Sequence, residues 1–149
     1  MLGLQVVNCF LLIIPVLLWN ALFSSKLPEG YFSDARVPRV IVNLEKTLRL
    51  LVLGFPILLP LQVEHSYGKA GLAIYVVGVV SYGASWVMQM YNRETRWSQS
   101  AIGILAPAYT PLIWMAGIAL IGRSGVYALL AVVFTFIHTW HKVMVFRFS

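Results

Sequence analysis

The chain has 149 residues, of which 60% are hydrophobic and only 11% are charged, with a formal net charge of +6. Soluble domains are about 45–50% apolar and about 25% charged, so this composition excludes an ordinary soluble domain. The length suits a single domain over residues 1–149. Because the cations stand beside hydrophobic runs, a membrane surface explains them better than nucleic acid does. The single cysteine, Cys9, excludes an intrachain disulfide and a cysteine-based metal site.

Five apolar runs of helical length follow one another along the chain. They are Leu2–Phe23, Val37–Leu61, Ala70–Met90, Ala101–Gly122 and Val126–Phe146. A membrane-spanning helix needs about 20 such residues. The first run has neither a positively charged start nor a small-residue cleavage signal, which favours a true span over a signal peptide. The pattern predicts an all-α, polytopic transmembrane helical bundle with five spans; four is the alternative count, with the last two runs taken as one.

The segments between these runs carry loop and turn signals. They are the Ser24–Ala35 loop, the Gln62–Lys69 turn, the polar Tyr91–Ser100 segment and a minimal turn at Arg123. Gly71, Gly78 and Gly83 give the third run room for close helix contact. Pro107 and Pro111 are expected to kink the fourth run.

The cations are distributed unequally over the two sides that a five-helix chain defines. One side carries Lys26, Arg36, Arg39, Arg93, Arg96, Lys142 and Arg147, and the other carries only Lys69 and Arg123. Loops rich in Lys and Arg stay in the cytoplasm. The asymmetry therefore predicts a multi-pass protein with its N-terminus outside and its C-terminus cytoplasmic.

The second run begins with a group of polar residues that we call the cationic stripe: Arg36, Arg39, Asn43 and Lys46. At about 100° per residue these side chains fall within roughly 80° of one another. Glu45 and Arg49 lie on another face, spaced as an i,i+4 pair. The stripe has two interpretations. It is either an interfacial helix start whose cations snorkel to the headgroups, or a binding site for carboxylate or phosphate.

A second polar cluster ends the last run, at His138, His141 and Lys142. The two histidines have a metal-binding spacing, but a metal site needs about three or four convergent ligands, so we predict none. The simpler interpretation is a helix end at the interface, anchored by Trp140. Because the polar clusters share the cytoplasmic side, we expect a pocket of cations and aromatics there for an anionic, partly apolar ligand.

The segment Arg36-Val-Pro-Arg39-Val-Ile-Val-Asn43-x-Glu45 resembles the signature that opens the second helix of the MAPEG superfamily. These are membrane-associated proteins of eicosanoid and glutathione metabolism. The stretches Tyr91-x-Arg93 and Leu105-Ala-Pro-Ala-Tyr109 are more loosely similar to the family's connection between its third and fourth helices. Two features depart from the family. Glu45 follows Asn43 by two residues where the family has three, so that Lys46 takes that place, and the family has four spans.

The resemblance implies glutathione as the cofactor. Arg39 and Asn43 would hold its carboxylate and amide groups, supported by Arg36, and Lys46 and Tyr91 would complete the binding set. Arg93 and Arg96 would activate the thiol, since a nearby cation lowers the pKa of a thiol.

The implied activity is that of a glutathione-dependent transferase or peroxidase acting on lipophilic electrophiles, in a homotrimer within the bilayer. Whether the chain is an enzyme stays open. One alternative is a non-enzymatic small bundle, either an accessory subunit or a lipid-binding partner of a membrane complex. The other is a membrane methyltransferase similar to the isoprenylcysteine type.

Overall fold

The computed structural model describes residues 7–147, and within this range the regular elements are all helices. The first residues of the predicted Leu2–Phe23 span, 2–6, lie outside the described range. The α-helices are α1 (Ile14–Phe23), α2 (Arg39–Gly54), α3 (Ser66–Tyr91), α4 (Arg96–Gln99), α5 (Ala101–Tyr109), α6 (Pro111–Ile121) and α7 (Gly125–Arg147). Three short 3-10 helices accompany them: η1 (Cys9–Leu12), η2 (Ser24–Lys26) and η3 (Phe55–Leu58). The predicted all-helical class is confirmed.

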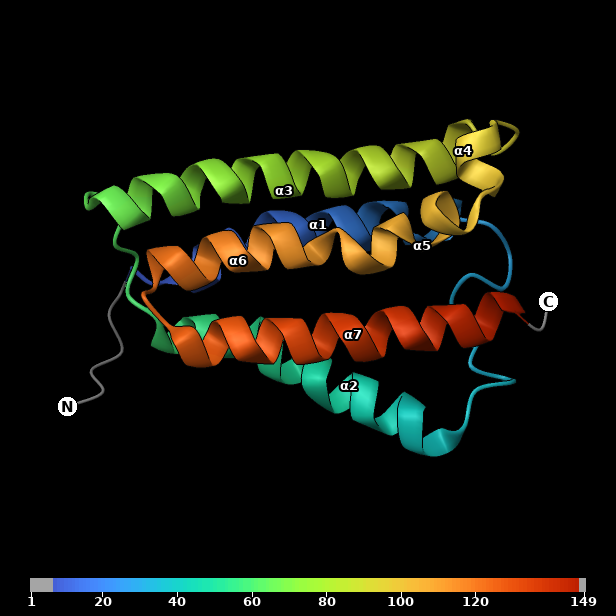
Figure 1. Ribbon diagram of the computed structural model, residues 1–149, viewed down its shortest axis with the longest axis horizontal. Coiled ribbons are helices and arrows are strands. Elements are labelled where there is room, and N and C mark those ends of the chain that lie inside the picture. Colours follow the sequence, from blue (N-terminus) through green and yellow to red (C-terminus); the bar gives the residue numbers. More distant parts are fainter. Residues whose placement is uncertain (1–6, 148–149) are drawn as a thin grey trace.

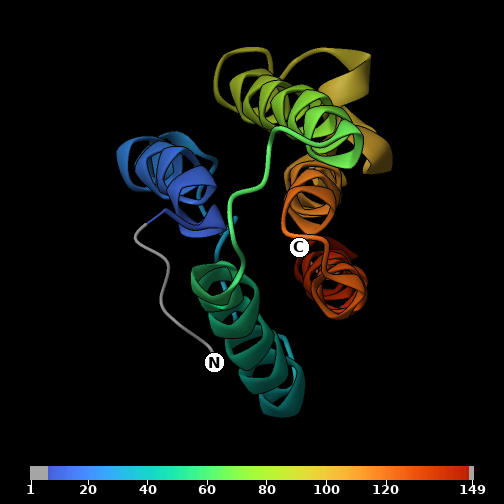
Figure 2. The same cartoon turned by 90° about the vertical axis from the view of Figure 1, so that its left-hand side faces the viewer.

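The long helices run side by side along one axis (Figure 1). Viewed along that axis, α3, α6 and α7 stack in one row, and α1 and α2 lie together on one side of the row (Figure 2). The closest packing is between α3 and α6, and α7 packs against α2, α5 and α6. The helix α7 thus joins α2 to the row formed by α3 and α6.

Four helical segments are long and apolar enough to cross a membrane: Cys9–Lys26, Ser66–Tyr91, Ala101–Ile121 and Gly125–Arg147. They correspond to four of the five predicted spans, so the chain has the features of a multi-pass membrane protein. The helix α2 is not among them, because Arg39, Glu45, Lys46 and Arg49 all fall within its 16 residues. A fifth span is therefore not established by length and composition.

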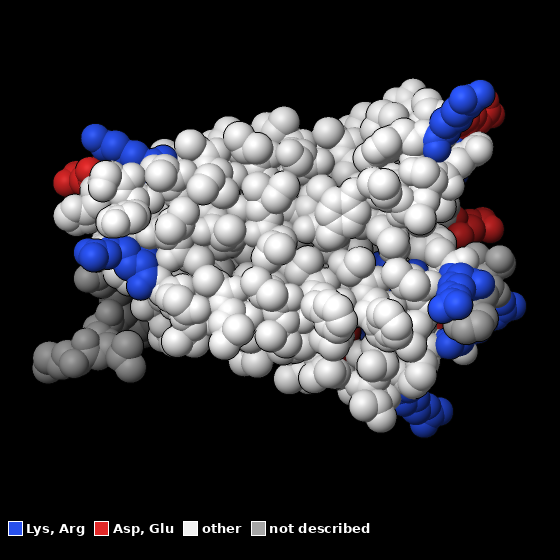
Figure 3. Space-filling view, viewed as in Figure 1, with Lys and Arg blue, Asp and Glu red and all other residues white. Residues whose placement is uncertain are grey.

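Charged side chains gather at the two ends of the bundle and leave the flank seen in Figure 3 almost wholly uncharged. Ionisable groups at the centre of a bilayer cost about 2.5–3.5 kcal/mol each on insertion scales. A flank free of charge between two charged ends is the pattern that this cost imposes on a membrane protein.

Glycines allow α3 and α6 to approach closely. A Cβ atom on Gly78 would lie 2.3 Å from the backbone nitrogen of Trp114, and one on Gly117 would lie 2.6 Å from the carbonyl oxygen of Gly71. Close helix contact had been expected at Gly71, Gly78 and Gly83, and the first two confirm it. A Cβ on Gly83 would meet only the Trp19 ring, at 3.7 Å, which is an ordinary contact.

Prolines interrupt two of the predicted helices. The run over residues 101–122 is divided into α5 and α6, and Pro111 opens the second piece. The prediction that α2 continues to Leu61 is wrong, because the α-helix ends at Gly54 and Pro56 lies in a 3-10 turn. Proline lacks the backbone N–H that would continue the helical hydrogen bonds, and its ring crowds the preceding turn.

Candidate functional site

A buried carboxylate lies at the contact between α2 and α7. Glu45 is only 1% exposed, since it shares the packed face of α2 with Val42, Leu48 and Val52. Its Oε1 atom accepts a hydrogen bond from the Arg49 guanidinium and lies 2.7 Å from Nδ1 of His138. The carboxylate therefore has a partner on its own helix and a second partner on α7. A buried charge is tolerated when it is paired in this way.

One turn further along α7, Lys142 is buried with 4% exposure. Its Nζ atom donates a hydrogen bond to the carbonyl oxygen of Tyr31 at 2.5 Å. The same ammonium lies 4.8 Å from the ring centroids of both Tyr31 and Phe32. These partners are all uncharged. The nearby carboxylate of Asp34 lies instead within 2.9 Å of His141 Nε2 and 3.8 Å of Lys46 Nζ.

The loop before α2 covers this end of the bundle. The buried Tyr31 hydroxyl donates a hydrogen bond to the Ile104 carbonyl at 3.2 Å, and the Tyr31 ring packs edge-on against Phe146. Burial raises the pKa of the Tyr31 phenol, with a smaller contribution from Tyr82, so the hydroxyl stays protonated and keeps donating. The loop is thereby held to α5 and α7.

These side chains border a cavity of about 380 Å³, which we call the central cavity. Its polar lining comes from Arg49, His138, Lys142, Asn20 and Ser24, and its aromatic lining from Tyr31, Phe32, Tyr82, Trp86, Trp114 and Phe134. The remaining wall is formed by Val16, Ala21, Val52, Leu53, Pro107, Ala108 and Pro111. A concave, mostly apolar space with a few convergent polar groups is the usual form of a small-molecule site.

Two polar groups on the wall of the central cavity differ in their hydrogen bonding: one has a partner and the other has none within residues 7–147. The Tyr82 hydroxyl donates to Oδ1 of Asn20 at 2.6 Å, which joins α3 to α1 across the cavity. The indole Nε1 of Trp114, although buried, has no hydrogen-bond partner among the described residues. Buried donors are normally paired, so the Trp114 N–H is an unsatisfied donor on the cavity wall.

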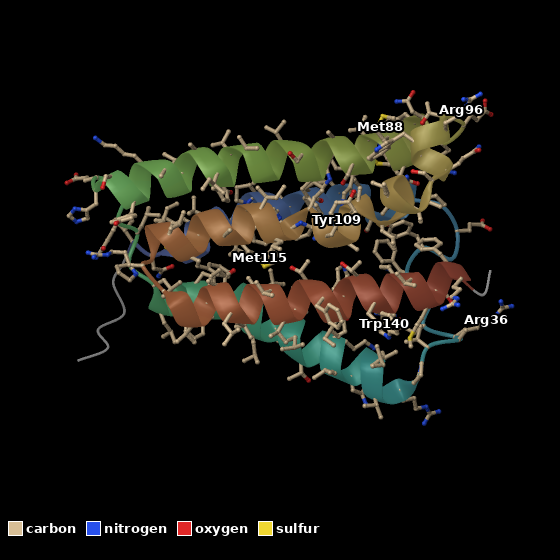
Figure 4. All side chains as sticks on the ribbon, in the orientation of Figure 1. Arg36, Met88, Arg96, Tyr109, Met115 and Trp140 are labelled. Carbon is tan, nitrogen blue, oxygen red and sulfur yellow. The ribbon has the colours of Figure 1, made fainter. Side chains whose placement is uncertain are left out.

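The residues of the cationic stripe lie outside the central cavity. Arg39, Asn43 and Lys46 are exposed and line a separate surface hollow near the start of α2, together with Asp34, Ala35, Val37 and Val42. Arg36 is also exposed, in the loop before α2, where it borders another hollow with Glu29 and Phe146. Figure 4 places Arg36 and Arg96 at the same end of the bundle but at different corners.

The other predicted site residues lie in the segment between α3 and α5. Arg93 donates to the carbonyl oxygens of Gln89 at 2.8 Å and Lys26 at 2.9 Å. The Tyr91 hydroxyl accepts a hydrogen bond from Lys26 Nζ at 3.4 Å. Arg93 and Tyr91 thus tie the end of α3 to η2, while Arg96 begins the short exposed helix α4.

Sequence reasoning assigned Glu45 and Arg49 to a self-neutralising pair and the end of α7 to an interface anchor. The pair is present, but its contact with His138 and its closeness to Lys142 were not predicted. A signal did exist: Val42, Glu45 and Val52 share one helical face, so the carboxylate stands in an apolar, packed stripe. Among residues 7–147, no three His, Cys, Asp or Glu side chains cluster as metal ligands would.

The comparisons with known proteins add no assignment. No family model, no curated protein and no solved structure matches the chain. The fold and the cavity define a class: an all-helical, multi-pass membrane protein with a partly cationic cavity inside its bundle. The function is argued below from that geometry.

Proposed function

We propose that the protein binds a small, partly apolar organic anion in the central cavity. The observation that carries this proposal is the buried ammonium of Lys142, which faces the cavity. Its direct contacts among residues 7–147 are a carbonyl group and two aromatic rings, with no carboxylate within 4.0 Å, although Glu45 and Asp34 lie close enough to act on it electrostatically. A buried cation without a paired anion is costly in a membrane protein and usually marks a ligand or ion site. A bound carboxylate or phosphate supplies the missing charge.

Counting charges around the cavity supports an anion over a cation. Glu45 and Arg49 neutralise one another, and the neutral form of His138 donates to Glu45 through Nδ1. Asp34 also lies nearby, but its carboxylate is 3.8 Å from the Lys46 ammonium, so this pair is neutral as well. Lys142 then leaves one positive charge unbalanced. Arg49 is 45% exposed and retains N–H groups beyond the one that binds Glu45, so it can make a bidentate contact with the anion.

The direct test compares anion binding by variants of two lysines, the buried Lys142 and the exposed Lys46. Lys142→Met keeps the length and packing of the side chain but removes the charge, and we expect it to weaken binding of decanoate at least tenfold, as measured by tryptophan fluorescence titration. A buried charged hydrogen bond is worth about 1.5–3 kcal/mol, which corresponds to this loss. Lys46→Met, at an exposed position, is the matched control and should bind as the parent does. Equal affinities in all three proteins would refute the proposal.

The membrane topology that fits this proposal has five crossings, with the N-terminus outside and the C-terminus cytoplasmic. The helix α2 lies along the other long helices (Figure 1), and its two deepest charges, Glu45 and Arg49, neutralise each other. A reporter fused after residue 149 should be active only in the cytoplasm. An extracytoplasmic signal from that fusion would eliminate five crossings.

A glutathione-dependent transferase of the MAPEG type is the second candidate. The observation in its favour is that Arg39, Asn43 and Lys46 share one surface hollow, as a site for a charged peptide would require. Since Arg36 and Arg96 lie at different corners (Figure 4), a site that used both sets of residues would combine two chains of an oligomer.

This candidate predicts that glutathione raises the melting temperature of the detergent-purified protein, because a ligand that binds the folded state stabilises it. Arg39→Ala should abolish the shift, whereas Lys142→Met should leave it intact. If glutathione leaves the melting temperature of the parent unchanged, the second candidate is eliminated and the first is unaffected.

A further inference from the structure

The lining of the central cavity changes in the same direction on several helices. On α7 it passes from Lys142 through His138 to Phe134. On the opposite wall, η2 and α1 contribute Ser24, then Asn20, then Val16. Each series is polar or charged at the end near the Tyr31 loop and apolar toward the middle of the bundle. The cavity therefore has a polar end and an apolar end.

The length of this gradient follows from helical geometry. Eight residues separate Lys142 from Phe134, and at 1.5 Å per residue this corresponds to about 12 Å. The row formed by α3 and α6 gives an independent estimate. Trp114 lies beside Gly78, where its backbone nitrogen is 2.3 Å from the position of a Cβ, and Trp86 is eight residues further along α3. The backbone of Trp86 thus lies about 12 Å along the bundle axis from that of Trp114, toward the polar end of the cavity, and Trp114 lies toward the apolar end.

We infer that the ligand is a single-chain amphiphile with one negative charge, bound with its head beside Lys142 and its tail beside Trp114 and Phe134. This inference rests on the proposed function and adds the class and the orientation of the ligand. The charge follows from the one positive charge that Lys142 leaves unbalanced. A neutral head would leave that charge unpaired, and a doubly charged head would bring an uncompensated negative charge into a medium of low polarity.

The volume restricts the tail to one chain. Small-molecule cavities span about 300–1,000 Å³, and the central cavity, at about 380 Å³, lies near the lower limit. A two-chain membrane lipid would have to leave one chain outside. Each methylene group that enters the apolar end contributes about 0.8 kcal/mol, or about fourfold in affinity, until the tail reaches the level of Phe134, about 12 Å from that of Lys142.

The orientation can be tested with dodecanoates that carry bromine, a contact quencher of tryptophan fluorescence. In a full-length protein that retains only Trp114, 12-bromododecanoate should give saturable quenching, and 2-bromododecanoate should give little. A protein that retains only Trp86 should show the reverse. A protein that retains only Trp140, which is 46% exposed on α7 (Figure 4), measures partition into the surrounding detergent and should show no saturation. The other tryptophans are replaced by phenylalanine, and helicity is checked by circular dichroism.

The charge can be tested with heads of different valence on the same twelve-carbon tail. Dodecanol and the dianion of dodecyl phosphate should each bind at least fivefold more weakly than dodecanoate. A single-chain phosphodiester lipid shares the charge of dodecanoate, and its affinity relative to dodecanoate identifies whether the natural head is a lipid phosphate or a free carboxylate.

The outcomes distinguish a failure of this inference from a failure of the proposed function. Saturable binding in which both bromine positions quench Trp86 and Trp114 alike, or in which the dianion binds as tightly as the monoanion, overturns this inference but leaves anion binding in place. Folded protein that shows no saturable quenching with any of these anions overturns the proposed function itself.

Discussion

Glu45→Leu is expected to lower the free energy of unfolding by about 3 kcal/mol, the cost of breaking a buried ion pair by removal of one partner. The carboxylate is 1% exposed and accepts hydrogen bonds from Arg49 and His138. Leucine fills a similar volume but leaves the guanidinium without its anion and the imidazole N–H without an acceptor. Reversible unfolding of the protein in mixed micelles provides the measurement.

Two further variants make this result interpretable. Glu29→Leu changes an exposed carboxylate in the loop before α2 and should shift the free energy of unfolding by less than about 0.5 kcal/mol. Glu45→Leu combined with Arg49→Leu should recover more than half of the loss, because replacing both partners of an ion pair by apolar residues is often neutral. A neutral effect of the single change would show that the Glu45 contacts do not support the fold.

Gly78→Ala should destabilise the protein by about 3 kcal/mol, the upper end of the range for overpacking in a well-packed interior. The added methyl carbon would lie 2.3 Å from the Trp114 nitrogen and 2.7 Å from its Cα atom. These are backbone atoms of α6, so no side-chain rotation relieves the clash, and α3 and α6 must separate. That separation would also break the close contact of Gly71 with Gly117 further along the same helix pair.

Gly83→Ala is the matched control on the same helix, since its methyl group would meet only the Trp19 ring at 3.7 Å. We expect a change of less than about 0.5 kcal/mol for this variant. Thermal unfolding followed by circular dichroism compares the two alanine variants directly. If the two variants unfold at the same temperature, the close packing of α3 on α6 does not contribute to the stability of the protein as described.

Much of the helical architecture was predictable because hydrophobic length is encoded locally. The runs around α3 and α7 were predicted within a few residues, and the small residues Gly71 and Gly78 indicated a close helix contact. The C-terminal end of α2 was not predicted, and between α5 and α6 a kink was predicted where the structure has a break at Pro111. Prolines at positions 56, 107 and 111 are compatible with either a kink or a stop, and the choice depends on tertiary contacts that satisfy the freed backbone groups.

The sequence predicted the chemical character of a pocket in the bundle but not the residues that line it. The sequence indicated a cation- and aromatic-lined pocket at one end of the bundle, and the central cavity has this character. The cationic stripe, however, faces outward, and the cavity uses Arg49, His138 and Lys142 instead. A helical wheel gives the angle between residues on one helix but not the direction in which the helix faces. For α2 that direction is set by the packing of Val42, Glu45 and Val52 toward the bundle interior and α7.

The central claim is that an organic anion binds inside the bundle beside Lys142. The most direct measurement is a crystal structure of the protein soaked with 2-bromododecanoate, in which anomalous scattering locates the bromine next to the carboxylate. The account predicts one strong bromine peak in the central cavity beside the Lys142 ammonium and none in crystals of Lys142→Met. Bromine found only in the surface hollow at Arg39, Asn43 and Lys46, or only on the lipid-facing flank, would contradict it.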